Sequence, residues 1–421
     1  TIKLDEFKSD SRFSDFDGSG YTVVIIDDGI DLDHPFFGPD TNRDGVADRI
    51  IYHQNMYYNS PISKYDNAPH GSHVASIVGS SDSKYPGIAP GVNIIALDIS
   101  NNSGDLTSSG IDNAYRWVAR NADKYNIVAV NMSYGSPFTN TSPTYNDLLN
   151  GMKNAGVALI SASGNSFLYF KNRLTGEYEI QNSKLGLGTP GSDVNVFSVG
   201  AVYDRKYQKF ENAVGHNGNF EDSGQFNFWE WDNTDDKVIT SFSNRHPTML
   251  DIFAPGATIA AAKEKTSGAI EFAGTSMASP IVAGVVALAQ QTAETLIGRR
   301  LEVDEIYELL KSSGEDIYDG YAGGNDKREL DTILNTSIGN ITAKPSNSWY
   351  KLLDVHAMAE AILDLAPRGS YKITITNTDK TQADFGFYAG STSIATPDSD
   401  YIIGTNRNDY ISALKGNDTV I

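Results

Sequence analysis

The chain of 421 residues contains no cysteine. This absence excludes disulfide bridges, zinc sites built on thiolates and cysteine nucleophiles. The chain also lacks an apolar run of the ~18 residues that a membrane-spanning helix needs, and its longest such run lies near 281–289. We therefore expect no membrane span. We also expect that any cross-link or metal ion that stabilises the fold does not use cysteine sulfur.

Basic residues are scarce relative to acidic ones. The chain has 33 Lys and Arg against 53 Asp and Glu, which gives a formal net charge of −20. A nucleic-acid partner would need Lys and Arg patches that neutralise phosphates, so we expect no nucleic-acid binding. Because 40% of the residues are apolar, general disorder is excluded. The length fits two or three domains, or one large α/β domain with an appendage. Because the chain begins at Thr1 without Met, we expect that a leader or pro-segment was removed or that the chain was trimmed.

Short apolar runs alternate with helix-like stretches over the first 300 residues. Unbroken apolar runs are typical of strands that are covered on both faces of a parallel sheet. The stretch 275–298 is apolar nearly all round, which predicts a buried central helix. The alternation predicts an α/β fold with a doubly wound, mainly parallel sheet and helices on both faces. The predicted strands are 21–26, 93–98, 127–132, 157–162 and 194–201, and the predicted helices are 71–78, 106–125, 144–155, 275–298, 303–312 and 352–365.

The composition changes after Pro367. Strand-like segments follow at 371–376 and 383–388, and the last residues, 404–421, contain two similar nonapeptides. We therefore divide the chain into a large domain at 1–366, a β segment or linker at 367–403 and a repeat segment at 404–421.

Four polar residues lie at the carboxyl ends of predicted strands or at the starts of predicted helices, where open α/β sheets bind their ligands. They are Asp27, His70, Asn165 and Ser276. Taken singly, each is an ordinary cap or turn residue. Together, a hydroxyl, an imidazole and a carboxylate form the minimum set for nucleophilic acyl transfer. An amide side chain can donate a hydrogen bond to the oxyanion that develops in such a reaction.

The sequence around these residues resembles the subtilase superfamily of subtilisin-like serine endopeptidases. Val-Ile-Ile-Asp-Asp-Gly-Ile-Asp surrounds Asp27, His-Gly-Ser-His-Val-Ala begins at His70, and Gly-Thr-Ser-Met-Ala-Ser-Pro surrounds Ser276. The order Asp, His, Ser is the subtilisin order, and the resemblance spans about residues 10–366. It implies a subtilisin-like fold, with Ser276 as nucleophile, His70 as general base and then acid, Asp27 orienting His70, and Asn165 donating to the oxyanion.

The resemblance also implies partners and a substrate groove. Subtilases act on protein or peptide substrates, which bind as an added β-strand, and their own propeptide is a transient inhibitor. We expect a secreted monomer. Because the groove segments hold no acidic residue, we expect a broad or apolar preference for the residue preceding the cleaved bond. The segments supply Ser133, Tyr134 and Gly135 on one edge, Ser103 and Gly104 on the other, and Ala162, Ser163 and Gly164 as a wall of the primary specificity pocket.

The segment 40–48 has oxygen-bearing side chains at alternating positions. Gly45 is the sixth residue, where calcium loops turn sharply, but Ile51 stands where a full EF-hand has its bidentate Glu. We expect a short structural Ca²⁺ loop, which would substitute for absent disulfides; the alternative is an Asp- and Asn-rich surface turn. The expected ligands are the side chains of Asp40, Asn42, Asp44 and Asp48 and the carbonyl of Val46.

The C-terminal nonapeptides resemble RTX (haemolysin-type) calcium repeats, with Asp409 and Asp418 as candidate ligands. Two copies cannot bury a solenoid core, since about three or more are needed. Either the natural chain continues past Ile421 or the repeats are vestigial. A complete β-roll would imply type I secretion.

Two alternative functions fit parts of the sequence. The pair His70 and His73 is not taken as a zinc site, because the resemblance assigns His73 to helix packing and the chain has no His-Glu-x-x-His motif. A binding or adhesion module is the second hypothesis, with the acidic, aromatic-rich insertion 203–237 and the tail as contacts. That insertion is either a surface excursion or a substrate rim. The intact set of four site residues favours the endopeptidase.

Overall fold

The computed structural model describes residues 1–62, 68–135, 146–167, 185–205, 236–240, 242–320 and 346–365. Beyond these it gives the backbone of short strands at 169–171, 178–180, 333–336, 339–341, 371–376, 382–387, 401–402 and 419–420. The predicted ligands Asp409 and Asp418 lie outside the described residues, as does 206–235, most of the predicted insertion.

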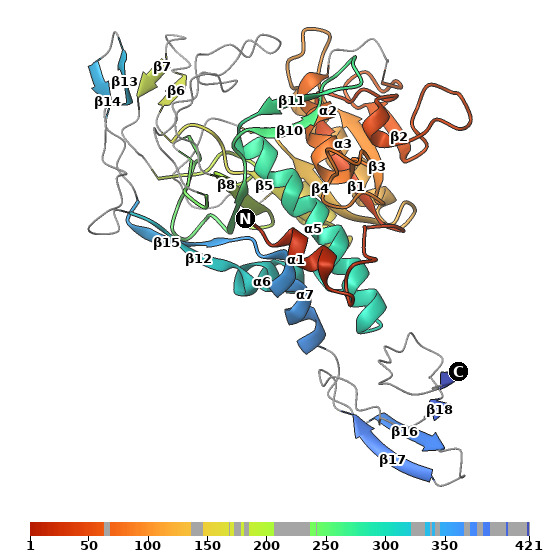
Figure 1. Ribbon diagram of the computed structural model, residues 1–421. Coiled ribbons are helices and arrows are strands. Elements are labelled where there is room, and N and C mark those ends of the chain that lie inside the picture. Colours follow the sequence, from red (N-terminus) through yellow and green to blue (C-terminus); the bar gives the residue numbers. More distant parts are fainter. Residues whose placement is uncertain are drawn as a thin grey trace.

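A nine-stranded sheet forms the centre of the molecule, with the order β12-β15-β9-β8-β5-β4-β1-β3-β2 (Figure 1). Neighbouring strands pair in parallel from β2 to β15, and β12 closes the edge by pairing antiparallel to β15. The strands are β1 (Thr22–Asp27), β2 (Ile50–Asn55), β3 (Asn93–Asp98), β4 (Ile127–Met132), β5 (Ala158–Ala162), β8 (Phe197–Val202), β9 (Ile252–Pro255), β12 (Glu315–Asp319) and β15 (Ser348–Leu352).

Helices cover both faces of this sheet. Because successive side chains of a strand point to opposite faces, the residues of one strand pack against two different sets of helices. Val23 and Ile25 of β1 belong to the core on one face, which also contains residues of α2 (Pro69–Gly79), α5 (Thr275–Leu296), α6 (Val303–Ser313) and α7 (Val355–Asp364). Val24 and Ile26 point to the other face, toward α3 (Ser108–Asn121) and α4 (Asp147–Asn154). The predicted doubly wound α/β fold is confirmed.

Helix α5 runs across the sheet and packs on β1, β4, β5, β8 and β9 (Figure 1). From Phe272 to Gln290 every residue is buried except Ser276, which is half-buried. The helix is therefore apolar because it is buried, as predicted. Ser276 is the residue of this stretch that reaches the surface.

The structure differs from the prediction in two places at the far edge of the sheet. The predicted helix 352–365 begins at Val355, because Leu352 ends β15 and the Asp354 side chain accepts a hydrogen bond from the Ala357 N–H at 2.9 Å. No strand is predicted over residues 315–319, which form β12. Other elements that the sequence did not predict include β2 and β9 of the central sheet, α1 (Leu4–Ser9), a short 3-10 helix (Pro35–Phe37) and the hairpin of β10 (Ile259–Ala262) and β11 (Ala269–Phe272).

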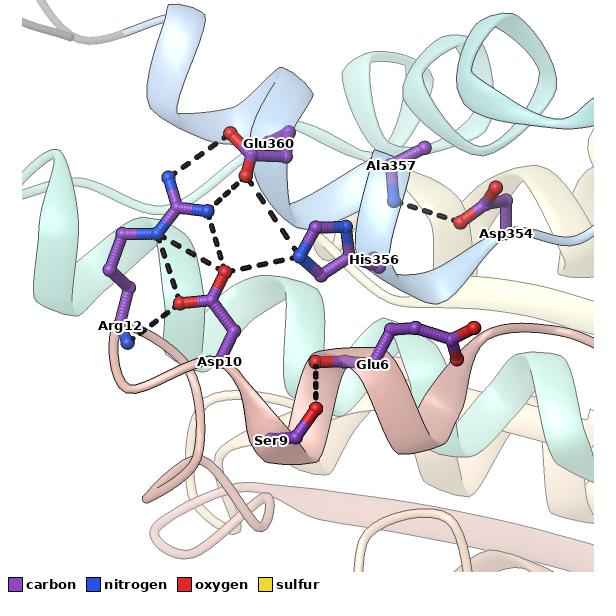
Figure 2. A network of polar contacts seen from close by, with 8 residues as sticks. All are labelled: Glu6, Ser9, Asp10, Arg12, Asp354, His356, Ala357 and Glu360. Carbon is purple, nitrogen blue, oxygen red and sulfur yellow. Dashed lines mark hydrogen bonds and ion pairs between the residues drawn. The ribbon is translucent and has the colours of Figure 1, made fainter.

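A polar network joins the N-terminal segment to α7 (Figure 2). The Arg12 guanidinium donates to the carboxylates of both Asp10 and Glu360, and the His356 Nε2 lies 3.1 Å from Asp10 Oδ2. The hydrogen bonds from Arg12 hold the pKa of Asp10 well below its usual range. These contacts, between residues almost 350 positions apart, fix the ends of the described domain to one another.

The tail has two further strand pairs. The strands β16 (Tyr371–Thr376) and β17 (Gln382–Phe387) form an antiparallel hairpin, close to the predicted 371–376 and 383–388. The strands β18 (Tyr401–Ile402) and β19 (Thr419–Val420) pair in parallel. Among the helices that the structure describes, none has the length and apolarity to span a membrane.

Candidate active site

The predicted site residues come from strands and helices that meet at one edge of the sheet. Asp27 ends β1, and Asn165 follows β5 closely. His70 and Ser276 are each the second residue of their helix, α2 and α5 respectively. Since α2 and α5 pack against one another and against β1, the fold gathers strand ends and helix starts at the carboxyl edge of a parallel sheet, where such folds bind ligands.

Asp27 and His70 form a direct pair. The His70 Nδ1 lies 2.8 Å from Asp27 Oδ1, and Asp27 is only 3% exposed. Burial disfavours the charged imidazolium, but the charge and hydrogen bond of Asp27, with the charge of Asp28, outweigh it and raise the pKa of His70 to about 9. Because Nδ1 faces the carboxylate, Nε2 is the nitrogen that can accept a proton from another group.

Asp28 is a second carboxylate at this site, and its role could not be predicted from the sequence. Its Oδ1 accepts a hydrogen bond from the Gly71 N–H at 2.7 Å, at the N-terminus of α2. Burial, and then the charge of Asp27, raise the pKa of Asp28 well above its usual range. Gly71 is required here, because a Cβ would lie 2.0 Å from the Gly29 carbonyl oxygen. Asp28 therefore helps to hold the helix that carries His70.

Ser276 is held by reciprocal bonds with Ser133. The Ser276 hydroxyl donates to the Ser133 carbonyl oxygen at 3.0 Å, and the Ser133 hydroxyl donates to the Ser276 carbonyl oxygen at 2.8 Å. The second bond satisfies a carbonyl that Pro280, four residues later, cannot serve because proline has no N–H. The proline in this helix thus leaves an acceptor through which β4 and the start of α5 are joined.

Two hydrogen-bond donors face the space beside Gly274. The Asn165 Oδ1 accepts from both the backbone N–H and the hydroxyl of Thr275, at 2.8 and 2.9 Å, so its Nδ2 points the other way. A Cβ placed on Gly274 would lie 3.5 Å from Asn165 Nδ2 and 3.6 Å from the Ser276 backbone nitrogen. Both donors can therefore reach one small anionic atom at the positive end of α5.

His73 has a structural place. It is fully buried, its Nε2 lies 3.0 and 3.1 Å from the carbonyl oxygens of Ile259 and Ile270, and its ring stacks on Phe272. Burial lowers its pKa to about 3. His73 therefore ties α2 to the β10–β11 hairpin in its neutral form, which agrees with the prediction that it packs a helix rather than binds zinc.

The predicted substrate segments lie at different depths. Ser133 to Gly135 follow β4, beside Ser276. Ala162, Ser163 and Gly164 are held on both sides: Ser163 is bonded to Val199, Gly188 and Asn244, and Gly164 to Thr275 and Asn244. Ser103 and Gly104 lie in an exposed turn, where the Gly104 N–H donates to the Asn101 carbonyl at 2.9 Å and the Ser103 N–H to the Asn101 side chain at 2.8 Å.

The predicted calcium loop is folded on its own backbone. Asp40 accepts from the N–H groups of Asp44 and Gly45 at 3.2 and 2.9 Å. Asn42 accepts from the Asp44 N–H and Asp44 from the Val46 N–H, both at 2.9 Å. The Asp48 carboxylate binds Thr41 instead. The side-chain oxygens of Asp40, Asn42 and Asp44 are thus arranged around one turn, with Gly45 at φ 84°, and this donor set of hard oxygens suits Ca²⁺.

Within the described residues, three acidic or histidine ligand atoms come within 4.8 Å of one another at Asp10, His356 and Glu360 alone. Arg12 already supplies the positive charge at that cluster (Figure 2). This arrangement is a salt-bridge network and needs no metal.

Known proteins resemble this chain over most of its length. The model of the subtilase family matches residues 18–340. The serine protease AprX of Bacillus subtilis (strain 168) is 28% identical over 324 residues, which is 70% of this chain and 61% of that protein. Subtilisin E of the same organism is 26% identical over 276 residues, 65% of this chain and 56% of the relative. The chain therefore spans less than two thirds of the length of these relatives. A solved structure described as a cold adapted subtilisin-like serine proteinase matches 81% of this chain and 90% of its own, with a TM-score of 0.49 and 24% identity.

Proposed function

Because the chain belongs to the subtilase family, we propose that it is a serine endopeptidase that hydrolyses peptide bonds through Ser276, His70, Asp27 and Asn165. One observation carries the proposal. The two donors beside Gly274 lie next to Ser276, the half-buried residue of an otherwise buried stretch, and the Asp27–His70 pair lies at the start of α2, which packs against α5. A base, a nucleophile and an oxyanion site are the three parts that acyl transfer needs.

The reaction follows from these positions. The Ser276 hydroxyl leaves the Ser133 carbonyl and attacks the substrate carbonyl carbon, while His70 Nε2 takes its proton. The Asn165 Nδ2–H and the Ser276 backbone N–H donate to the oxyanion. Asp27 stabilises the imidazolium, which then gives its proton to the leaving amine as the peptide C–N bond breaks. Water, deprotonated by His70, attacks the acyl-enzyme and releases the acid and Ser276.

Protein or peptide substrates lie along the edge formed by Ser133, Tyr134 and Gly135 in this proposal. Ser103 and Gly104 form the opposite edge, and residues 162–164 the wall beside Asn165. The chain works as a secreted monomer, and its own propeptide, which would occupy the same groove, is a transient inhibitor. Support comes from family membership and from the position of Ser133 beside Ser276.

Substitution of the nucleophile tests the activity. Ser276→Ala should lower the rate of casein hydrolysis by more than about 10⁴-fold, since the nucleophile cannot be replaced by the remaining groups. The matched control is Ser109→Ala, an exposed serine of α3, which should keep full activity. If the Ser276→Ala protein still cleaves casein, the mechanism is wrong. If the unaltered chain binds casein but cleaves nothing, the binding-module hypothesis is favoured.

A structural Ca²⁺ at residues 40–48 is the second part of the proposal. Asp40, Asn42, Asp44, Asp48 and the Val46 carbonyl would hold it, and the bound ion would neutralise carboxylates that now meet backbone N–H groups, the Asn42 side-chain amide and Thr41. An ion bound only by the folded state stabilises that state by about 2.7 kcal/mol at 100 times its Kd. EDTA should therefore lower the melting temperature, and an unchanged melting curve would contradict the site.

The tail is proposed to be the start of an RTX-like calcium β-roll, with Asp409 and Asp418 as ligands and type I secretion as the export route. Support comes from the register of the last strands. Tyr401 pairs with Thr419 and Ile402 with Val420, in parallel, so the spacing between paired residues is twice the nine-residue period of the repeats. Calcium titration of a chain truncated after residue 366 against the whole chain would test this, because the whole chain should bind more ions.

A further inference from the structure

A pocket of about 330 Å³ lies beside Tyr134 and Gly135, the segment that follows Ser133. Its apolar walls include Leu106, Ile111 and Leu149. None of the four proposed catalytic residues lines it. The pocket is therefore separate from the bond-cleaving groups but adjoins the edge along which a peptide is proposed to lie.

Asp193 lines this pocket and carries an unusual carboxylate. The residue is 4% exposed, and its Oδ1 accepts hydrogen bonds from the N–H and the side-chain amide of Asn195, both at 2.9 Å. Its Oδ2 is buried and has no hydrogen-bond partner among the described residues. A buried carboxylate oxygen without a partner is costly, unless a donor arrives from outside.

Among the residues that line the pocket, the Asn146 N–H acts on the Asp193 carboxylate and partly offsets the rise in its pKa that burial causes. The hydroxyls of Tyr115 and Tyr134 are bonded to each other at 2.8 Å. Asp112 is a second carboxylate in the lining, and it is exposed. The charges of Asp112 and Asp193 both act on Tyr115, whose pKa is raised chiefly by burial and further by these two groups. The charged residues of the pocket are thus both negative.

We propose that this pocket takes a lysine or arginine side chain of the substrate, and that Asp193 selects it. The inference rests on the proposed endopeptidase function. The apolar walls would pack the methylene stem of such a side chain while its charged head reaches the carboxylate, as long cationic side chains do elsewhere. A metal ion is a poorer match, because the pocket lining has two carboxylates, Asp112 and Asp193, beside mostly apolar walls. The net charge of −20 would also attract cationic peptides.

Matched fluorogenic peptides test this directly. A library should show that Lys is preferred over norleucine, and Arg over citrulline, at one position other than that preceding the cleaved bond, by about tenfold or more in kcat/KM. Asp193→Asn keeps an oxygen that can accept from Asn195 but loses the charge, and should reduce this ratio about tenfold. Asp112→Asn, at an exposed position, should reduce it less. The control Asp123→Asn removes one exposed charge outside the pocket and should leave the ratio unchanged.

The ratio separates selection from a purely structural role, since misfolding would lower both members of a peptide pair together. A ratio near one in the unaltered chain, or an unchanged ratio in a folded Asp193→Asn protein, would overturn the proposal. Calorimetry on the Ser276→Ala chain measures how tightly it binds the same peptides. This binding tests the pocket proposal independently of the proposed endopeptidase function. If no peptide is cleaved but the Lys peptide binds more tightly than its norleucine partner, the endopeptidase assignment fails and the pocket proposal stands. Equal binding would overturn the pocket proposal.

Discussion

The proposed active site and the loop at residues 40–48 are both rich in carboxylates, but the two regions hold them in different ways. In the active site, Asp27 is buried and bonded to a residue 43 positions away. In the loop, Asp44 is exposed and bonded to residues two positions away. The fold itself therefore positions the proposed catalytic groups, whereas the loop gains its geometry from local turns and would gain its stability from an ion.

Loss of an oxyanion donor should produce the largest effect in this comparison. Asn165→Ala removes Nδ2 and should lower kcat by about 10²–10³-fold, or about 2.7–4 kcal/mol of transition-state stabilisation. Gly274→Ala should act similarly, because its methyl group would occupy the space that both donors face, at contact distances of 3.5 and 3.6 Å that the fold tolerates. Steady-state kinetics on a peptide substrate measures kcat for both proteins. Full activity with either substitution would contradict the assigned oxyanion site.

The activity should depend strongly on pH. Since the pKa of His70 is raised to about 9, the neutral base is the minor form at pH 7, and kcat/KM should rise about fiftyfold between pH 7 and 9. The folding contribution of the Asp27–His70 pair has the opposite sign: it is complete below the unfolded pKa of about 6.5 and is lost as the pH rises through 9. A pH–rate profile checks the first statement; a profile flat from pH 6 to 9 would contradict it.

Substitution of Gly71 at the start of α2 should test how tightly the fold confines the helix that carries His70. Gly71→Ala places a Cβ 2.0 Å from the Gly29 carbonyl oxygen, and we expect a loss of about 1–3 kcal/mol in the free energy of unfolding. Gly151→Ala is the control, because nothing lies within 4 Å of its Cβ position in α4. Urea denaturation measures both proteins. Equal stability of the two would show that α2 is not confined as described.

The smallest effect is expected in the loop without metal. Asp44→Ala should cost less than about 1 kcal/mol in EDTA, because an exposed side chain gains little from its own turn. With Ca²⁺ the same substitution should remove the added stability and make the melting temperature insensitive to EDTA. Asp15→Ala, exposed and outside the loop, is the control. If Asp44→Ala keeps the calcium response, the ion lies elsewhere.

The sequence predicts the elements that have a local apolar pattern. It predicts few of the features that depend on pairing between residues far apart in the chain. Predicted strands 93–98 and 127–132 match β3 and β4 at both ends, because their apolar runs end at polar residues. The strands β12 and β15 were missed because they form an antiparallel edge with polar, half-exposed positions.

The site shows the same division. The four proposed catalytic residues could be predicted because each lies in a specific motif. The bond of Asp28 to Gly71 and the open oxygen of Asp193 could not, since both depend on segments that meet only in the folded chain. A buried carboxylate in a turn such as Asp193 has no sequence signal that distinguishes it from an ordinary turn residue.

Covalent labelling tests the central claim most directly. The activated hydroxyl of a serine attacks the phosphorus of a fluorophosphonate and displaces fluoride, so the adduct reports the base, the nucleophile and the oxyanion donors in one measurement. Mass spectrometry of the digested protein should place the adduct on the peptide that contains Ser276, and the His70→Ala chain should label far more slowly. An unlabelled Ser276, or labelling that is equally fast without His70, would contradict the account.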